Sequence, residues 1–533
     1  MPAERHPWRA AAAPVALCLP LWLAAPAPAA PAELLRIGVA VETSGIDPHL
    51  SASQPNAQAL RHVFEPLVAM DAAQRPVPGL AVSWELDRVD PRRWVFRLRP
   101  GVRFHDGQPF GAEDVAASLR RAMDPPGGVG GYASYLRQVV GFTVLDEHTL
   151  ELRTAAPHPA LPFDLTAPMI VSRHAAAAPP DAFSSGQRAA GTGPYRFAGW
   201  RRGTELLFER NPAWWGEKPA WARVQMLPRS QDGARVAALL AGEVDLIDQV
   251  PTTALETIRG RPDLRLSQAV TSRLIFLALD AMRPVTPFMT DSAGRPLQPN
   301  PLRDPLVRRA LSLALDRGAI VSQVMGGMAL PAGQLLPPGM IGTDPSLLPD
   351  PHDPAEARRL LRQAGVPEGA RLVLHGPNDR YLNDEKVLVA VAGMLRRVGL
   401  AAEPVVAPFS VFRARQRRHD ASMTLNSWGT ETGDASLALR ALLGAPGRPT
   451  GWGQVNFLGY ANEAFESALA TAMREADEPA RLAALARATG IAMADRGVLP
   501  LYFQHAVWAS NRGVDYRPRR DEYTLAISAH PAR

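Results

Sequence analysis

The sequence predicts an α/β protein with more than one domain, and three observations support this. The chain has 533 residues, 46% of them hydrophobic and 21% charged, which is an ordinary globular composition. A chain of this length is longer than one hydrophobic core usually supports, so we expect two or three domains. Apolar or alternating segments typical of strands are mixed along the chain with segments of helical spacing, which favours an α/β fold.

The first 33 residues form a pattern of their own. Arg5 and Arg9 precede an apolar run at residues 11–25, and small residues follow at 26–32. This order is typical of a secretory signal peptide cleaved near Ala32. A membrane anchor is the alternative, but the apolar run is short for a span and contains prolines. We therefore expect residues 1–32 to be a cleaved signal peptide and the mature protein to be exported.

Cysteine use limits the chemistry that the mature protein can perform. The only cysteine, Cys18, lies inside the predicted signal peptide. A lipid-anchored bacterial protein would need a small residue just before the modified cysteine, whereas Leu17 stands here, so we expect no lipoprotein. The mature chain would then have no cysteine, which excludes thiol catalysis, thiolate metal sites and disulfides.

The charge is positive but not concentrated. The formal net charge is +6, and of the 58 basic residues only Lys218 and Lys386 are lysines. The arginines are spread along the chain and interleaved with 52 acidic residues. A nucleic-acid-binding protein usually gathers its cations on one element. The sequence therefore predicts no nucleic-acid partner.

Three segments of the first part are predicted as strands. Residues 33–40 (ELLRIGVA) read as a buried strand that begins the fold. In residues 93–104 the residues Trp94, Phe96 and Leu98 alternate and share one face, as in a half-buried strand. Residues 142–154 are predicted to form a hairpin with a turn near its acidic centre.

Three segments further along the chain are predicted as helices. Residues 304–325 place apolar side chains at helical spacing throughout. Residues 353–365 have helix-boundary signals at both ends, with Asp353 as the N-cap and Gly365 as the C-terminal stop. Residues 386–399 form another amphipathic helix that ends at a glycine.

The stretch RFHDGQPFGAEDV at residues 103–115 could be a polar site or a piece of scaffold. The Asp-Gly pair after His105 is a turn signal, and Gly111 occupies the N-cap position of a following helix. Glu113 and Asp114 then fall in the first helical turn, where acids complement the helix dipole. A metal would need His105 and these acids to converge, although a turn separates them. We therefore predict scaffold.

Read from Trp94 to Val115, the same segment resembles the signature W-x-F-x-L-R-x-G-V-x-F-H-D-G-x-P-F-x-A-E-D-V of the family-5 solute-binding proteins of bacterial ABC importers, the peptide and nickel group. Other matches occur in the family's order: FEPLV at 64–68, PGLAVSWE at 78–85, GTGPYRF at 191–197, ERNPAWWGEKP at 209–219, AGEVDLID at 241–248, DPLVRRALSLALDRGAIV at 304–321, DPAEARRLLRQAG at 353–365, and LPLYFQHAVWA at 499–509. The resemblance covers nearly the whole mature chain.

The resemblance implies a type II periplasmic-binding-protein fold, in which two lobes are joined by a hinge and lobe I carries an extra subdomain. One hinge crossing would be LIFLALDA at residues 274–281. The implied parts are lobe I in 33–66, 189–281 and 503–533, the extra subdomain in 67–188, and lobe II in 282–502.

The resemblance also places the ligand site, at TLNSWGTETGDAS in residues 424–436. From the residues alone, this stretch is a strand end followed by a polar loop. In the family it faces the cleft between the lobes. Trp428 would lie beside the ligand backbone, flanked by Ser427 and Gly429, and Glu431 would hold the ligand's amino group with Asp434 in reach. A closed cleft excludes water, so an ammonium there needs a fixed anionic partner.

Two departures from the family bear on this site. Peptide-binding members usually have Asp where this chain has Glu431, and the oligopeptide branch has Arg where this chain has Leu425. Across the cleft, the loop at residues 49–56 matches the lobe I segment that faces ligand, with Ser53 and Gln54 as candidate contacts.

The implied function is that of the periplasmic solute-binding subunit of an ABC importer for a peptide or similar small amine-bearing solute. The closed form would dock on an inner-membrane permease, and nucleotide hydrolysis would belong to a separate ATPase subunit, because the chain has no P-loop. We expect a monomer without cofactor or metal. A binder of a nickel complex, opine or other non-peptide solute is the alternative. An exported hydrolase is a weaker alternative, because the sequence has no G-x-S-x-G and no H-E-x-x-H motif.

Overall fold

The computed structural model describes residues 32–126, 131–430, 432–448 and 450–532. The predicted signal peptide, apart from Ala32, lies outside the described residues, and so does Glu431. Within the described ranges, no helix is both long and apolar enough to span a bilayer.

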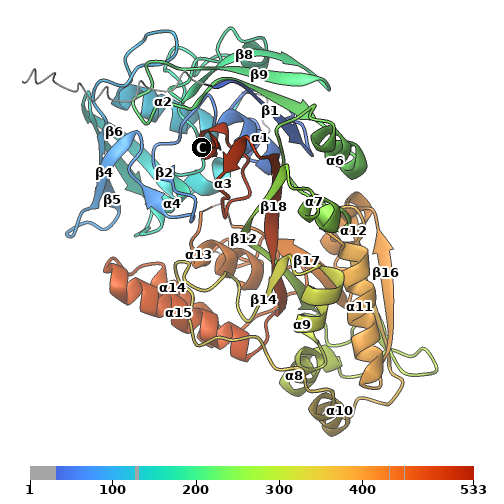
Figure 1. The fold of residues 1–533 in the computed structure, drawn as a ribbon. Helices are drawn as coiled ribbons and strands as arrows, with labels where there is room; N and C mark the ends of the chain where they lie inside the picture. Colours follow the sequence, from blue (N-terminus) through green and yellow to red (C-terminus); the bar gives the residue numbers. More distant parts are fainter. Residues whose placement is uncertain (1–31, 127–130, 431, 449, 533) are drawn as a thin grey trace, which may run out of the picture.

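A single mixed sheet of twelve strands runs through the molecule (Figure 1). Ten strands form its path in the order β13 (Met289–Thr290), β15 (Arg371–Pro377), β17 (Met423–Trp428), β12 (Leu264–Leu279), β18 (Leu499–Asn511), β11 (Leu246–Ile247), β1 (Ala32–Val39), β10 (Trp221–Pro228), β9 (Glu205–Arg210) and β8 (Tyr195–Arg201). Off this path, β14 (Ala329–Pro331) pairs with β18, and β16 (Ala401–Ala407) pairs with β15. The predicted first strand at residues 33–40 is confirmed as β1.

The long antiparallel strands β12 and β18 connect the two halves of the molecule, as Figure 1 shows. Their register is interrupted, because Val270 pairs with His505 whereas the next pair joins Leu274 to Phe503. The residues between Val270 and Leu274 therefore bulge out of the ladder, and a bulge bends a strand and re-aims its side chains. The segment LIFLALDA begins directly after this bulge.

The first half packs around β1, β10 and the end of the chain. Helices α1 (Gln54–Leu60) and α6 (Asp232–Leu240) lie in this half with α7 (Leu255–Arg259) and η1 (Thr252–Ala254). The C-terminal segment adds the pair β19 (Val514–Tyr516) and β20 (Ala529–Pro531), with η5 (Ala526–Ser528) between them. Its aromatic side chains share a core with residues of β1, so the two ends of the described chain belong to one body.

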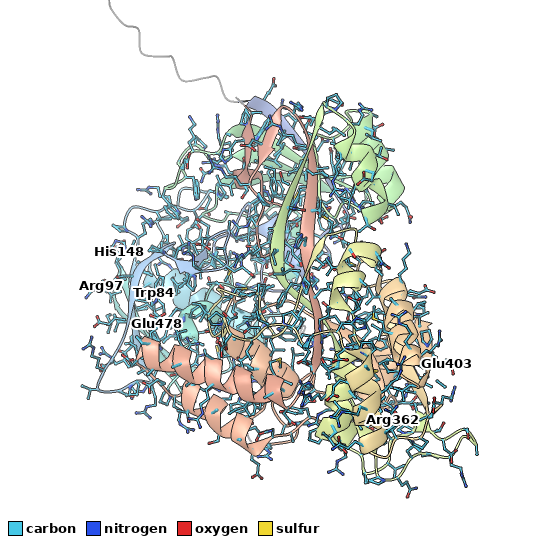
Figure 2. The ribbon with its side chains drawn as sticks, turned by 60° about the horizontal axis from the view of Figure 1, so that its bottom comes forward. Trp84, Arg97, His148, Arg362, Glu403 and Glu478 are labelled. Atoms are coloured by element: carbon cyan, nitrogen blue, oxygen red, sulfur yellow. The ribbon has the colours of Figure 1, made fainter. Side chains whose placement is uncertain are left out.

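A second sheet forms a separate core within this half. Its order is β4 (Ala81–Leu86), β5 (Arg93–Leu98), β7 (Thr149–Thr154) and β6 (Val139–Asp146), and β2 (Ala69–Met70) pairs with β3 (Pro76–Val77) nearby. The alternation of Trp94, Phe96 and Leu98 is confirmed, since all three are buried. Three helices accompany this sheet: α2 (Ala112–Met123), α3 (Ala133–Leu136) and α4 (Leu161–Asp164), whereas α5 (Pro180–Ser184) packs through Phe183 into the core around β1. This sheet lies at one edge of the molecule, where Figure 2 labels Trp84, Arg97 and His148.

The stretch at residues 103–115 is scaffold, as predicted. Gly111 is the N-cap of α2, and its N–H donates to the Asp114 carboxylate at 2.9 Å. The second Asp114 oxygen accepts from the Arg173 N–H at 2.8 Å. His105 Nε2 lies 3.0 Å from the Gly193 carbonyl, and burial lowers the pKa of His105 to about 4. These groups tie loops together instead of converging on a ligand.

The second half is mainly helical around β15, β17 and the lower part of β12. Its helical segments are η2 (Pro301–Arg303), α8 (Pro305–Leu313), α9 (Arg317–Ala319), η3 (Ile320–Val324), α10 (Pro354–Gln363), α11 (Asp384–Arg397), α12 (Phe409–Arg417), α13 (Ala435–Ala438), η4 (Leu439–Leu443), α14 (Glu463–Ala472) and α15 (Glu478–Ala494). Asp353 caps α10 as predicted, accepting from the Glu356 N–H at 2.9 Å.

The single helix predicted at residues 304–325 is wrong in one respect. The chain leaves helical geometry after Leu313 and restarts as α9 and the π-helical η3. Asp316 caps the restart, because its side chain accepts from the Ala319 N–H at 2.8 Å. Aspartate competes with helix propagation in this way wherever it can satisfy a free N–H group.

Candidate ligand-binding site

A cavity that is open to solvent lies in the second half and is floored by strands β12 and β17. Its walls come from the loop before α11, from α12 and from the segment after η4. The lining residues are Arg273, Phe276, Ala278, Leu279, Arg380, Tyr381, Phe409, Arg413, Gln416, Thr424, Asn426, Ser427, Trp428, Leu442, Val455, Asn456, Phe457, Leu458, Tyr460, Gly497 and Val498.

Strand pairing places Trp428 at this cavity. Residues 424, 426 and 428 of β17 share one face, and Trp428 pairs with Leu274 of β12 directly after the bulge. The indole is half-buried, and its Nε1–H is covered yet has no acceptor among the described residues. A buried donor without an acceptor is costly. An acceptor on a bound solute would remove that cost.

Three arginines surround the rim of the cavity. Arg273 comes from the bulge of β12, Arg380 from the loop before α11, and Arg413 from α12. Tyr381 lies among them. Burial raises the pKa of its hydroxyl, while Arg380, a hydrogen bond with the Ser427 backbone, Arg273 and Arg413 oppose that rise. The positive charges of all three arginines therefore act on the same group of the cavity, the Tyr381 hydroxyl.

Arg273 links the two halves of the molecule. Its guanidinium contacts the Glu522 carboxylate at 2.6 Å from Nη2 and 2.8 Å from Nε, and Nη1 lies 3.4 Å from the Ser427 hydroxyl. Gly429 lies against the same group, since a Cβ there would be 3.6 Å from Arg273 Nη2. Ser427 and Gly429, the predicted neighbours of Trp428 at the ligand, both lie against Arg273. Arg273 in turn binds Glu522 of the C-terminal segment.

The predicted contacts on the opposite side lie in a hydrogen-bonded loop. Gln54 Nε2 donates to Gln58 Oε1 at 3.0 Å and to the Glu522 carbonyl at 3.3 Å. The hydroxyl of Ser53 donates to Asn56 Oδ1 at 3.1 Å, and the residue is exposed. Gln54 is therefore brought to the segment that holds Arg273, but neither Gln54 nor Ser53 lines the cavity described above. Their contact with a ligand stays a prediction.

Asp434 requires a correction. It is 1% exposed and caps α13, where one carboxylate oxygen accepts from the Ser436 N–H at 2.7 Å. Its other oxygen forms an ion pair with Arg481, which is itself 3% exposed. Both oxygens are engaged and buried, so Asp434 stabilises the loop and is not available to a ligand ammonium. Glu431 lies outside the described residues, and its role stays a prediction.

The loop after Trp428 also contacts the subdomain built on the four-stranded sheet. Gln74, 1% exposed, donates from Nε2 to the Thr430 carbonyl at 2.8 Å. Gly433 lies against the same residue, since a Cβ there would be only 2.2 Å from the Gln74 carbonyl oxygen. The same Thr430 carbonyl accepts from the Ser272 hydroxyl of the bulge at 3.1 Å. The Thr430 carbonyl of the candidate ligand loop thus accepts hydrogen bonds from both the bulge and the subdomain.

Sequence reasoning missed several residues of this site: Arg273, Arg380, Tyr381, Arg413 and Glu522. In a chain with 58 basic residues, a single arginine gives no signal of its own. These side chains meet only because residues 273, 380, 413 and 522 come together in the fold. Across the described residues, no group of three or more His, Cys, Asp or Glu side chains could hold a metal ion.

Two halves joined by two strands, with an open cavity beside them, are the architecture expected of a solute-binding protein. Comparison with known families agrees, since residues 75–449 match the model of the bacterial extracellular solute-binding proteins, family 5. The chain belongs to this family, and the predicted resemblance is confirmed. Membership makes the protein a solute-binding subunit of an ABC importer, a class that works with a membrane permease.

Individual relatives are similar over most of their length. The glutathione-binding protein GsiB of Pectobacterium atrosepticum is 25% identical over 448 residues, covering 83% of each chain. The di/tripeptide-binding protein 2 of Pseudomonas aeruginosa is 26% identical over 489 residues, covering 86% of this chain and 87% of the relative.

Solved structures share the fold. HbpA2 from Haemophilus parasuis superposes with a TM-score of 0.80 at 22% identity, covering 94% of this chain and 100% of that chain. The periplasmic binding protein DppA from Helicobacter pylori, in complex with the peptide STSA, gives a TM-score of 0.75 at 21% identity, covering 94% and 99%. The predicted fold class, an α/β periplasmic-binding-protein fold, is confirmed.

Proposed function

We propose that this protein captures a small peptide or peptide-like solute in the cavity beside Trp428 and delivers it to an ABC permease in the inner membrane. The observation that carries the proposal is the cavity at the end of β17, where the Trp428 indole N–H has no acceptor among the described residues. The relatives named for glutathione and for di- and tripeptides support a solute of this size.

The remaining parts of the proposal follow from the sequence. The mature protein begins near residue 33 after signal cleavage, resides in the periplasm and acts as a monomer without catalysis of its own. The permease is served by a separate ATPase subunit. Lobe I would comprise 33–66, 189–281 and 503–533, with the subdomain at 67–188, and lobe II would comprise 282–502. The bulge of β12 and the facing part of β18 would form the hinge. A ligand that contacts both lobes shifts the equilibrium toward the closed form.

A ligand panel tests the proposal. Di- and tripeptides, glutathione, opines and nickel with histidine would be screened by thermal shift, and hits measured by calorimetry. We expect a peptide-like hit to raise the melting temperature, because a ligand that binds only the native state stabilises it. Trp428→Ala should weaken that hit roughly 30-fold or more, as loss of a buried aromatic contact does. A hit restricted to opines or nickel–histidine, or turnover of a peptide, would contradict the proposal.

The matched control is Trp84→Ala. Trp84 is also half-buried, but it lies on the four-stranded sheet at the edge of the molecule, where Figure 2 labels it. This variant should bind the hit with unchanged affinity. Weakening by both substitutions alike would show a general loss of structure and remove the assignment of Trp428 to the site.

Gln74→Ala should speed ligand release. The Gln74 amide donates a buried hydrogen bond to the Thr430 carbonyl, which we assign to the closed form. Loss of such a bond costs about 1 kcal/mol, so the dissociation rate in stopped-flow experiments should rise about fivefold. The exposed neighbour Arg75, replaced by alanine, serves as the control. An unchanged rate in Gln74→Ala would show that this contact does not hold the closed form together.

A further inference from the structure

The loop before helix α11 brings Arg380 and Tyr381 to the cavity, and one carboxylate holds this loop together. Asp384, the first residue of α11, accepts from the backbone N–H groups of Arg380 and Tyr381, both at 3.0 Å. Asp384 is 5% exposed, so water competes little for these bonds. A further hydrogen bond joins the Tyr381 hydroxyl to the Ser427 backbone of β17. The loop is therefore a fixed part of the cavity wall.

Asn383 ends this loop and contacts the first half of the molecule. Its backbone lies in the left-handed region, with a φ of 56°, which asparagine tolerates better than most residues. Its side chain does not cap α11. The Nδ2 atom donates instead to the Thr252 hydroxyl at 3.1 Å and to the Val324 carbonyl at 2.9 Å. The amide thus joins the cavity loop to η1 and does not serve the helix that it precedes.

The bond between Asn383 and Thr252 connects two separate cores. Thr252 begins η1, which continues into α7, and Leu255 of α7 lies in a core with strand residues of the first half. Helix α11 packs through Val387 into the main core of the second half. Figure 1 shows α7 at the boundary between the halves, beside α11 and α12. A hydrogen bond across this boundary forms only while the two halves are close together.

We propose that Asn383 and Thr252 are positioning residues that couple the cavity wall to closure of the two lobes. When the lobes close, the Thr252 hydroxyl accepts from the Asn383 amide and holds the loop that presents Arg380 and Tyr381. A solute that contacts this loop stabilises the closed form in return, because coupling between two sites is reciprocal. The inference rests on the proposed function and adds the contact through which occupation of the same cavity favours closure.

Threonine variants test the role of the hydroxyl. Thr252→Val removes the acceptor and nearly keeps the shape of the side chain. The probe is trialanine or glutathione, whichever binds the wild type more tightly. In stopped-flow experiments we expect the dissociation rate to rise about fivefold and the association rate to stay within about twofold. Thr252→Ser keeps a hydroxyl and should release the probe like the wild type. Thr253→Val, at the exposed neighbour in η1, is the matched control and should do the same.

A double-mutant cycle tests whether the two side chains act together. Asn383→Gly removes the amide and keeps access to the left-handed backbone. It should raise the dissociation rate at least as much as Thr252→Val, because the bond to the Val324 carbonyl is lost as well. Adding Thr252→Val to Asn383→Gly should raise the rate no further. Multiplying effects would show that the side chains act separately, and would overturn the pair.

Fluorescent labels test closure directly. Apart from Cys18 the chain has no cysteine, so Arg97→Cys and Arg362→Cys give one labelling position in each half. Both positions are exposed, and Figure 2 labels them on opposite sides of the molecule. Single-molecule energy transfer at saturating probe should show that Thr252→Val stays in the closed form for about one fifth of the time that the wild type does before each opening.

The outcomes separate the inference from the proposed function. If the wild type binds the probe and Thr252→Val matches it in release and in closed lifetime, the inference is overturned and the proposed function stands. Fast release by Thr252→Ser or Thr253→Val would show that the hydroxyl is not the cause, and would also overturn it. Urea denaturation without ligand should give the same midpoint for Thr252→Val and wild type; a lower midpoint would assign the contact to general stability instead. If no peptide of the panel binds the wild type, the proposed function fails and the inference fails with it.

Discussion

Replacing Asp434 with alanine should lower the free energy of unfolding by about 3–5 kcal/mol, the usual cost of removing one partner of a buried ion pair. The substitution leaves the Arg481 guanidinium, 3% exposed, without its carboxylate. It also removes the N-cap of α13, which begins directly after Asp434. Urea denaturation followed by circular dichroism would measure the change.

Two comparisons sharpen this prediction. Glu478→Gln changes an exposed acid at the first turn of α15, labelled in Figure 2, and should alter stability by less than about 0.5 kcal/mol. Asp434→Asn retains a capping oxygen but loses the charge, so we expect an intermediate loss. If Asp434→Ala unfolds like the wild type and instead abolishes ligand binding, Asp434 is a ligand contact and the structural role assigned to it is wrong.

Glu65 should make stability depend on pH in the neutral range. Its carboxylate accepts from the indole N–H groups of Trp214 at 3.2 Å and Trp215 at 3.0 Å. Burial raises the pKa of Glu65 to about 7 from 4.5, although both indoles and Arg99 oppose the rise. Because the folded-state pKa is the higher one, this stabilising contribution is complete below pH 4.5 and is lost as pH rises through 7.

Glu65→Gln removes the titration and keeps an acceptor for the indoles. Relative to this variant, the wild type should lose up to about 3 kcal/mol of unfolding free energy between pH 5 and pH 8. Urea denaturation of both proteins at several pH values would measure it. Glu217→Gln, an exposed site two residues beyond Trp215, should parallel the wild type at every pH. A constant difference between wild type and Glu65→Gln across the range would contradict the raised pKa.

Local features of the fold were predictable because their causes lie within a few residues. Asp353 caps α10 through the N–H group three residues along, and Asp114 engages the N–H group of Gly111 within the same turn. The family resemblance added what such local rules lack, namely the periplasmic-binding-protein fold, and it supplied the prediction that Trp428 contacts the ligand. The break after Leu313 escaped prediction, because apolar spacing continues through it and only the capping geometry of Asp316 reveals the restart.

The chemistry of the site was harder to predict, because its partners are distant in sequence. Asp434 looked like a free loop acid, but Arg481, 47 residues away, pairs with it in the core. Arg380 and Arg413 meet at one cavity because the loop before α11 and helix α12 lie beside the same strands. Neither position carries a local motif. Sequence patterns therefore predicted a ligand loop but not the charges that surround it.

The most direct test of this account is a crystal structure of the protein with a peptide that the ligand panel identifies. The account predicts that the peptide lies against Trp428 in the cavity on β12 and β17. A peptide bound elsewhere on the molecule would contradict the assignment of the site.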